Sequence, residues 1–181
     1  MFHTPKTCCF IGHRNATLSN QENDFLYSTI EDLIKKKVSI FLFGSKSNFD
    51  TICYKIVTQL KNKYLNIKRI IYTCKSETAF IESTSQEKNE LLQKLNGAFY
   101  FEKIHKSDTD FKFRKNSYIE RNKAMIKNSD YCVFYFNNDY LPINKNNENN
   151  QTKSGTALAF SYANKLNKKI INIYELKQSN I

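Results

Sequence analysis

Short runs of apolar and β-forming residues recur along the chain, and longer polar stretches separate them. Several runs are apolar at consecutive positions, as in strands whose two faces are both covered. The runs that predict strands span residues 7–11, 38–43, 69–73, 98–104, 131–136 and 169–174. The pattern therefore predicts a sheet of about six strands.

The segments between these runs repeat apolar residues at the spacing of one helix face. The clearest stripe starts at Phe49 and ends at Leu60, with apolar residues at i, i+3, i+4, i+7, i+8 and i+11. Further helical patterns cover residues 26–34, 76–95, 115–129 and a segment that begins at Gly155. This last segment carries several small residues, which let backbones approach closely, and we expect it to be the most buried helix.

Alternating strands and helices predict a mainly parallel sheet, because parallel strands need crossover connections and those crossovers cover both faces. The expected fold is α/β, a Rossmann-like three-layer sandwich with helices on both faces of the sheet. No repeat or interdomain linker interrupts the chain, so residues 1–181 are expected to form a single domain. The asparagine-rich stretch at 137–153 is expected to be a mobile polar loop and a candidate lid.

The chain is strongly basic, with a formal net charge of +11. Clustered cations gain affinity for nucleic acid by releasing counterions. Here the lysines are spread along the chain, and the longest basic run is only Lys35 to Lys37, at a predicted helix end where cations suit the helix dipole. A solvated basic surface is therefore favoured over nucleic-acid binding, which stays an alternative.

The five cysteines point to core positions rather than to a metal site, because none forms a CxxC pair or lies at zinc-ligand spacing from a histidine. No metal and no cofactor are expected. No segment has the pattern of a signal peptide, and no apolar run approaches the roughly 20 residues of a membrane span. We expect a soluble cytoplasmic protein without a membrane partner, and a homo-oligomer stays open.

Three of the four glycines, Gly12, Gly44 and Gly155, fall where a predicted strand or loop gives way to a helix. Glycine lets a ligand approach the backbone, and a helix N-terminus offers unpaired N–H groups. Open α/β sheets bind ligands outside the carboxyl ends of their strands. Hydroxyl or cationic residues accompany each turn, so the three turns together predict a pocket for phosphate or ribose oxygens.

The common catalytic and cofactor fingerprints are absent. Neither GxGxxG after the first strand nor GxxxxGK[ST] occurs, which excludes the signatures of dinucleotide dehydrogenases and P-loop NTPases. There is also no GxSxG elbow and no evident pair of carboxylates for glycoside chemistry. The site is suited to phosphate, and its chemistry stays open.

Five polar residues near these turns are candidates for a role in the site. For His13, ligand contact or local capping is favoured over catalysis. Arginine is rare in this lysine-rich chain, so Arg14 and Arg121 indicate planar bidentate contacts, either to phosphate or to a buried carboxylate. Asp50 is a candidate for a ribose contact or a general base, or a first-turn carboxylate that favours the helix dipole. Asn122 is a candidate for reading a base or holding a neighbouring loop.

Four blocks of the chain together resemble a known family. They read CCFIGHR, FGSKSNFD, RNKAMIKNSDYCVFYF and SGTALAFSYANKLNKKIINIY, at residues 8–14, 43–50, 121–136 and 154–174. In order and spacing they resemble the YpsA-like branch of the SLOG superfamily, which also includes the DprA and LOG (lonely guy) proteins. The resemblance covers nearly the whole chain.

This resemblance implies a Rossmann-like fold that binds a nucleotide or a nucleotide derivative at the carboxyl edge of the sheet. By position, it assigns ligand contacts to Gly12, His13, Arg14, Gly44, Ser45, Asp50, Arg121, Asn122, Ser154, Gly155 and Thr156. One departure concerns catalysis: LOG enzymes resemble PGGxGTxxE where this chain reads TKSGTALA, so Ala159 stands in place of the glutamate. Whether the protein is an enzyme is therefore open.

Three functions are compatible with these observations. The first, which we favour, is binding or sensing of a nucleotide-derived small molecule. The second is cleavage or transfer at an N-glycosidic bond of the LOG type, with Asp50 as a weak candidate for the missing carboxylate. The third is single-stranded DNA binding of the DprA type.

Overall fold

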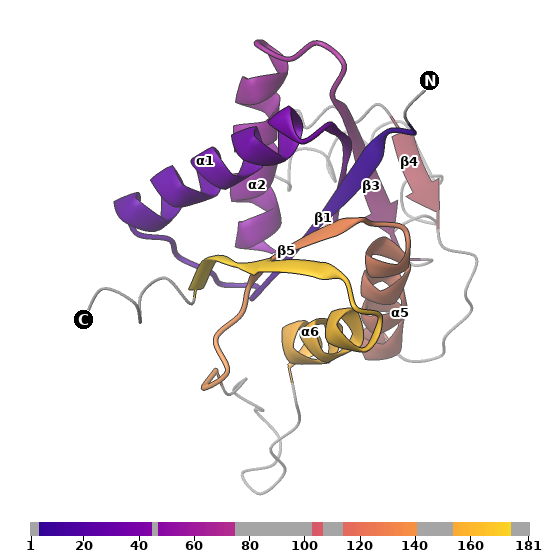
Figure 1. Ribbon diagram of the computed structural model, residues 1–181. Coiled ribbons are helices and arrows are strands. Elements are labelled where there is room, and N and C mark those ends of the chain that lie inside the picture. Colours follow the sequence, from indigo (N-terminus) through magenta and orange to yellow (C-terminus); the bar gives the residue numbers. More distant parts are fainter. Residues whose placement is uncertain (1–3, 45–46, 75–102, 107–113, 141–153, 175–181) are drawn as a thin grey trace, which may run out of the picture.

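The fold is built around a sheet of six parallel strands. A computed structural model of the chain describes residues 4–44, 47–74, 103–106, 114–140 and 154–174. The strands are β1 (Lys6–Gly12), β2 (Val38–Phe43), β3 (Lys68–Thr73), β4 (Lys103–Lys106), β5 (Tyr131–Tyr135) and β6 (Lys169–Asn172). They lie in the order β4-β3-β2-β1-β5-β6, and every neighbouring pair is parallel (Figure 1).

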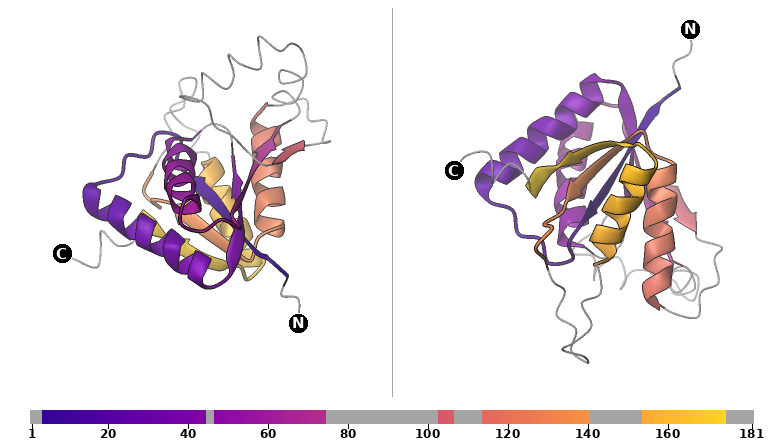
Figure 2. Two further views of the ribbon diagram at one scale, coloured as in Figure 1. Left: turned by 90° about the horizontal axis from the view of Figure 1, so that it is seen from above. Right: turned by 60° about the horizontal axis from the view of Figure 1, so that its bottom comes forward.

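Helices cover both faces of this sheet and complete a three-layer α/β sandwich. The helices of the described residues are α1 (Asn20–Lys35), α2 (Asn48–Lys61), α5 (Arg114–Lys127) and α6 (Gly155–Lys165). Figure 2 shows α1 and α2 on one side of the sheet and α5 and α6 on the other. This arrangement confirms the predicted Rossmann-like architecture with a parallel sheet.

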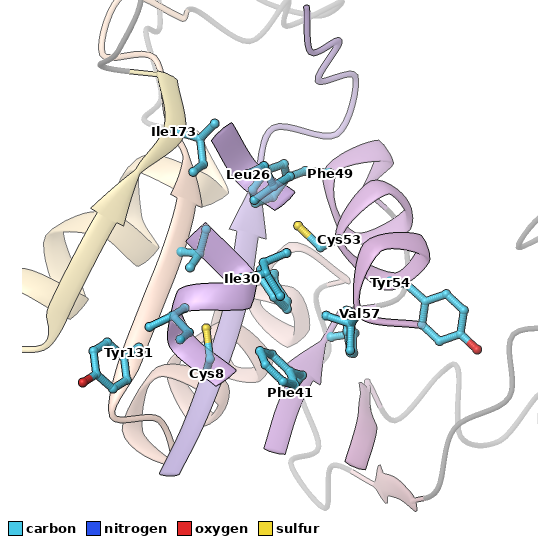
Figure 3. Close-up of a cluster of buried hydrophobic side chains, with 14 of the residues drawn as sticks. Cys8, Leu26, Ile30, Phe41, Phe49, Cys53, Tyr54, Val57, Tyr131 and Ile173 are labelled. Atoms are coloured by element: carbon cyan, nitrogen blue, oxygen red, sulfur yellow. The ribbon is translucent and has the colours of Figure 1, made fainter. Parts of the chain in front are cut away.

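The central strand β1 separates two hydrophobic cores, because its side chains alternate between the faces of the sheet. Cys8 points into the core under α1 and α2 (Figure 3). Phe10 belongs to the same core, and its ring centroid lies 5.2 Å from that of Phe43. Cys9 and Ile11 point into the second core, under α5 and α6. All five cysteines are buried and free, as their positions in the sequence predicted.

Most predicted elements coincide with observed ones, and two predictions need comment. The fourth strand is observed at 103–106 and overlaps the predicted run at 98–104 at its end, while residues 98–102 lie outside the described residues. The helix that begins at Gly155 is not the most buried: three of its residues are buried, against six in α2. The predicted helix at 76–95 lies outside the described residues, as do residues 141–153 of the predicted loop at 137–153. No helix of the described ranges has the length and apolar character needed to cross a membrane.

The strand order places a switch point between β1 and β5. The chain runs outward from β1 to β2, β3 and β4 on one side, and then returns to β5 and β6 on the other. At such a point the connections from neighbouring strands diverge to opposite faces, which opens a crevice outside the carboxyl ends of the strands. The expected ligand-binding edge is therefore the carboxyl edge of the sheet, where β1 ends at Gly12.

Close packing explains why residue 12 is glycine. A Cβ added at Gly12 would lie 2.5 Å from Cβ of Phe49, in the first turn of α2. The adjoining backbones are also bonded, because the Asn48 N–H donates to the Arg14 carbonyl oxygen at 2.9 Å. Gly155 differs, since a Cβ there would meet no heavy atom within 4 Å.

This contrast gives a paired prediction for Gly12→Ala and Gly155→Ala. The first variant is expected to lose about 1–3 kcal/mol of unfolding free energy, because the added methyl group overpacks a rigid contact. The second is expected to lose nothing or to gain about 0.5–1 kcal/mol, because alanine restricts the unfolded chain. Urea denaturation measures both. Equal stability of the two variants would contradict the packing explanation.

Candidate functional site

The candidate site lies at the carboxyl edge of the sheet, where β1, β2 and β5 end and α2 and α6 begin. Ten of the eleven residues expected there lie in the described part of the chain, and Ser45 lies outside it. These ten residues fall into three groups, around Gly44, around His13 and at the start of α6.

The first group is built around the carboxylate of Asp50, in the first turn of α2. Asp50 is only 8% exposed. Its Oδ1 accepts from the Gly44 N–H at 3.0 Å, and its Oδ2 accepts from the Ser47 hydroxyl at 2.7 Å. Ser47 is also the N-cap of α2, since its Oγ accepts from the Asp50 N–H at 2.9 Å. The carboxylate thus holds the turn between β2 and α2.

Arg121 reaches the same place from α5, on the opposite face of the sheet. Its Nη2 would lie 2.8 Å from a Cβ added at Gly44, and Asp50 Oδ2 would lie 3.0 Å from that atom. Glycine at position 44 therefore lets the two charged groups converge. Burial raises the pKa of Asp50, and the positive charge of Arg121 opposes that shift together with hydrogen bonds from Ser47 and Gly44.

Two further contacts of Arg121 also lie within the protein. Its guanidinium is 5.2 Å from the ring centroid of Tyr118, and its Nη2 donates to Asn122 Oδ1 at 3.2 Å. Arg121 is 8% exposed. Of the two roles that the sequence left open for this arginine, these contacts correspond to the buried carboxylate rather than to phosphate. Asn122 is a neighbour that helps to hold the guanidinium.

The second group is centred on His13, which is buried and joins the ends of β1 and β5. Its Nε2 accepts from the Asn137 N–H at 3.1 Å, and its backbone N–H donates to the Tyr135 carbonyl oxygen at 3.3 Å. An accepting Nε2 places the proton of the neutral ring on Nδ1. Burial lowers the pKa of His13 below its ordinary 6.5. His13 therefore links the segments that follow β1 and β5.

Arg14 differs from the buried arginines. Its side chain is exposed, while Arg69 and Arg121 are 5% and 8% exposed. Arg69 is held inside by the Thr58 hydroxyl at 2.8 Å. Within the described residues Arg14 contributes only its carbonyl oxygen, to Asn48, and its guanidinium has no ion pair. Arg14 is thus a cation at the switch point that is open to solvent.

The third group lies at the start of α6. The Ser154 hydroxyl caps the helix by accepting from the Ala157 N–H at 3.0 Å. Thr156 is buried, whereas a Cβ added at Gly155 would meet no heavy atom within 4 Å. A helix start of this kind presents backbone N–H groups and positive partial charge.

The sequence did not indicate three residues that shape this edge. Asn137 and Tyr140 form the turn after β5 that rests on His13, with ring centroids of His13 and Tyr140 4.1 Å apart. Glu22 is buried at the start of α1, where its carboxylate accepts from the Tyr135 hydroxyl at 3.2 Å. Burial and the charge of Glu22 raise the pKa of Tyr135 to about 12.

Two chemical roles find little support among the described residues. No group of three or more His, Cys, Asp or Glu side chains there is arranged to hold a metal ion. Ala159, at the position of the LOG glutamate, is 3% exposed and packs in the second core. A carboxylate at this position would point into apolar surroundings rather than into the edge.

The bond between His13 and Asn137 predicts a pH dependence that His13→Gln removes. Below pH 6.5 the unfolded chain protonates His13 while the folded chain resists, so the wild type loses stability as pH falls toward the lowered folded pKa. Glutamine keeps an acceptor but does not titrate. Unfolding free energies at pH 8, 7, 6 and 5 should show the wild type losing more than the variant. Parallel curves would contradict a neutral, buried His13.

Comparisons with known proteins agree with this architecture. A search of curated proteins gave no match. The chain resembles the solved structure of DNA processing protein A from Helicobacter pylori, reported with a single-stranded DNA binding mode of that protein, with a TM-score of 0.55 and 20% identity. The match covers 92% of this chain and 64% of the other, so the chain spans less than two thirds of that protein. At this identity the likeness supports the fold alone.

A family model gives the assignment that the four sequence blocks suggested. The model, YpsA, described as the YspA SLOG family, matches residues 10–176. The match includes the ends of β1, β2 and β5 and the start of α6, where the candidate site lies. The chain therefore belongs to the YpsA SLOG family.

Proposed function

We propose that the protein binds a nucleotide or a nucleotide-derived small molecule in the crevice outside the carboxyl ends of β1 and β5. The observation that carries this proposal is the exposed Arg14 guanidinium at the switch point of a parallel sheet, which has no ion pair with any described residue. Such a guanidinium binds phosphate in a bidentate manner. The capped, open start of α6 at Gly155 offers a second set of donors at the same edge.

The contacts at this edge divide the candidate residues into two roles. Asp50 and Arg121 are buried and bonded within the protein, and a carboxylate at the start of α2 disfavours an anion there. We therefore assign them to the framework, together with the packed Gly12 and Gly44. Direct contacts with the phosphate are assigned to Arg14, Ser154 and Gly155.

A hydrolase of the LOG type receives less support from the same contacts. Asp50, its weak candidate for a catalytic carboxylate, already accepts hydrogen bonds from Gly44 and Ser47 and faces the charge of Arg121. A general base needs a free acceptor within reach of the proton that it removes. We therefore propose binding rather than cleavage.

The proposal predicts a selective effect of Arg14→Ala on nucleotide binding. Loss of a charge-assisted hydrogen bond of roughly 1.5–3 kcal/mol weakens affinity about 10- to 100-fold. Calorimetric titration with AMP, ADP, ADP-ribose and cyclic nucleotides measures this effect. Lys55→Ala, an exposed cation in the middle of α2, is the matched control and should bind as the wild type does. Equal affinity of both variants, or no binding by the wild type, would refute the proposal.

Single-stranded nucleic acid is a second candidate ligand, supported by lysines along the amino edge of the sheet. This edge, opposite Gly12, collects the starts of the strands and the ends of the helices. Exposed lysines at this edge include Lys6, Lys36, Lys37, Lys68, Lys103, Lys127 and Lys169. Four of the six strands, β1, β3, β4 and β6, start with a lysine, which places several cations along this edge. Asp130 is an exposed carboxylate at the same edge.

The salt dependence of oligonucleotide binding tests this second candidate. The triple variant Lys36→Gln, Lys37→Gln and Lys68→Gln should weaken binding and lower the slope of log affinity against log salt by about 0.7 for each lost contact. Fluorescence anisotropy with a labelled oligothymidine measures both quantities. Lys55→Gln should leave the slope unchanged. Undetectable binding at low salt would eliminate nucleic acid as a ligand of this edge.

A further inference from the structure

Aromatic side chains gather at the carboxyl edge, beside the switch point. The rings of His13 and Tyr140 lie 4.1 Å apart, centroid to centroid, and those of His13 and Phe136 lie 6.0 Å apart. Phe136 in turn stacks on Phe160 of α6 at 4.7 Å. The rings thus form a continuous aromatic row, called here the edge stack, from Tyr140 through His13 and Phe136 to Phe160.

Tyr140 is the outer member of the edge stack. It is 38% exposed, whereas His13 is 5% exposed and Phe136 and Phe160 are half-buried. One side of the Tyr140 ring therefore rests on His13, and part of the ring stays open to solvent. An aromatic ring in this position offers a flat apolar surface next to His13, whose neighbour in the chain is the exposed Arg14.

A chain of hydrogen bonds fixes the position of Tyr140. The Tyr140 N–H donates to the Asn137 carbonyl oxygen at 3.2 Å, and the Asp139 N–H donates to Asn137 Oδ1 at 2.9 Å. Asn137 is itself held by His13 Nε2 at 3.1 Å. The turn is thus closed at both ends and tied to β1. Because the backbone of the turn is held and the Tyr140 ring already packs on His13, the ring loses little conformational entropy when a ligand stacks on it.

We propose that the exposed surface of Tyr140 is the stacking platform for the base of the bound nucleotide. This inference rests on the proposed function and assigns the base to the end of β5, while Arg14 and the start of α6 hold the phosphate. Stacking on an aromatic side chain is tolerant of base identity, because every base has a π-face. The site accordingly selects for the presence of a base more than for its identity.

The absence of tryptophan from the chain allows a direct test. Tyr140→Trp introduces a single indole at the platform, and Phe25→Trp introduces one at a control position in α1, where Phe25 is 39% exposed. AMP should change the emission of the first variant in a saturable way and leave the second unchanged. Ribose 5-phosphate, which lacks a base, should leave both unchanged.

Affinity measurements complete the test. Tyr140→Ala should weaken AMP binding roughly 5- to 100-fold, and Tyr140→Phe should bind within about twofold of the wild type, because the ring face is kept. Ribose 5-phosphate should bind the wild type and Tyr140→Ala equally. If AMP binds the wild type but Tyr140→Ala matches it and the indole does not respond, the platform is wrong and the proposed function stands. If AMP and the other nucleotides fail to bind the wild type, both are wrong.

Discussion

The burial of Asp50 and Arg121 around Gly44 is the constraint on which the carboxyl edge depends. Removing two charges from water is costly, and the cost is offset only when each charge is paired and hydrogen-bonded. Here Asp50 comes from α2 and Arg121 from α5, on opposite faces of the sheet. Their convergence at the end of β2 ties the outer layers together where the ligand is proposed to bind. Removal of Arg121 would leave Asp50 buried with only its hydrogen bonds from Gly44 and Ser47 to offset the cost of the charge.

A second link, between His13 and Asn137, holds the other half of the edge. It joins the ends of β1 and β5 through an uncharged imidazole, whereas the link at Gly44 uses full charges. Both links are made by groups of the protein itself, so the framework of the edge does not depend on a ligand. In the described part of this edge, the groups available for contact include the Arg14 guanidinium, the start of α6 at Gly155 and the exposed ring of Tyr140. Preorganisation of this kind reduces the entropy lost on binding.

The sequence predicted much of the fold because apolar periodicity reports burial directly. Consecutive apolar residues marked the doubly covered strands, and the stripe from Phe49 to Leu60 marked α2. The scarcity of arginine also indicated that Arg121 would meet either phosphate or a buried carboxylate. The contact between His13 and Asn137 was beyond such reasoning, because 124 positions separate the two residues. It exists because the strand order places β5 beside β1, and local patterns do not encode strand order.

The three glycines at predicted turns also show what local sequence can and cannot predict. Their positions at strand ends indicated turns that could admit a ligand. The sequence alone could not show that Phe49 fills the space at Gly12, or that Arg121 and Asp50 fill the space at Gly44, while Gly155 stays open. These differences arise from side chains on other elements. As a result, the turns at Gly12 and Gly44 are packed, and the turn at Gly155 is accessible.

The most direct measurement is an NMR titration with protein labelled with ¹⁵N only at glycine. The chain has four glycines, so the spectrum contains few signals, and Gly155→Ala assigns one of them. If the carboxyl edge binds a nucleotide, saturating AMP or ADP-ribose should shift the signals of Gly12 and Gly155, the two glycines that flank the crevice. Nucleotide binding detected by calorimetry with both signals unmoved would contradict the account.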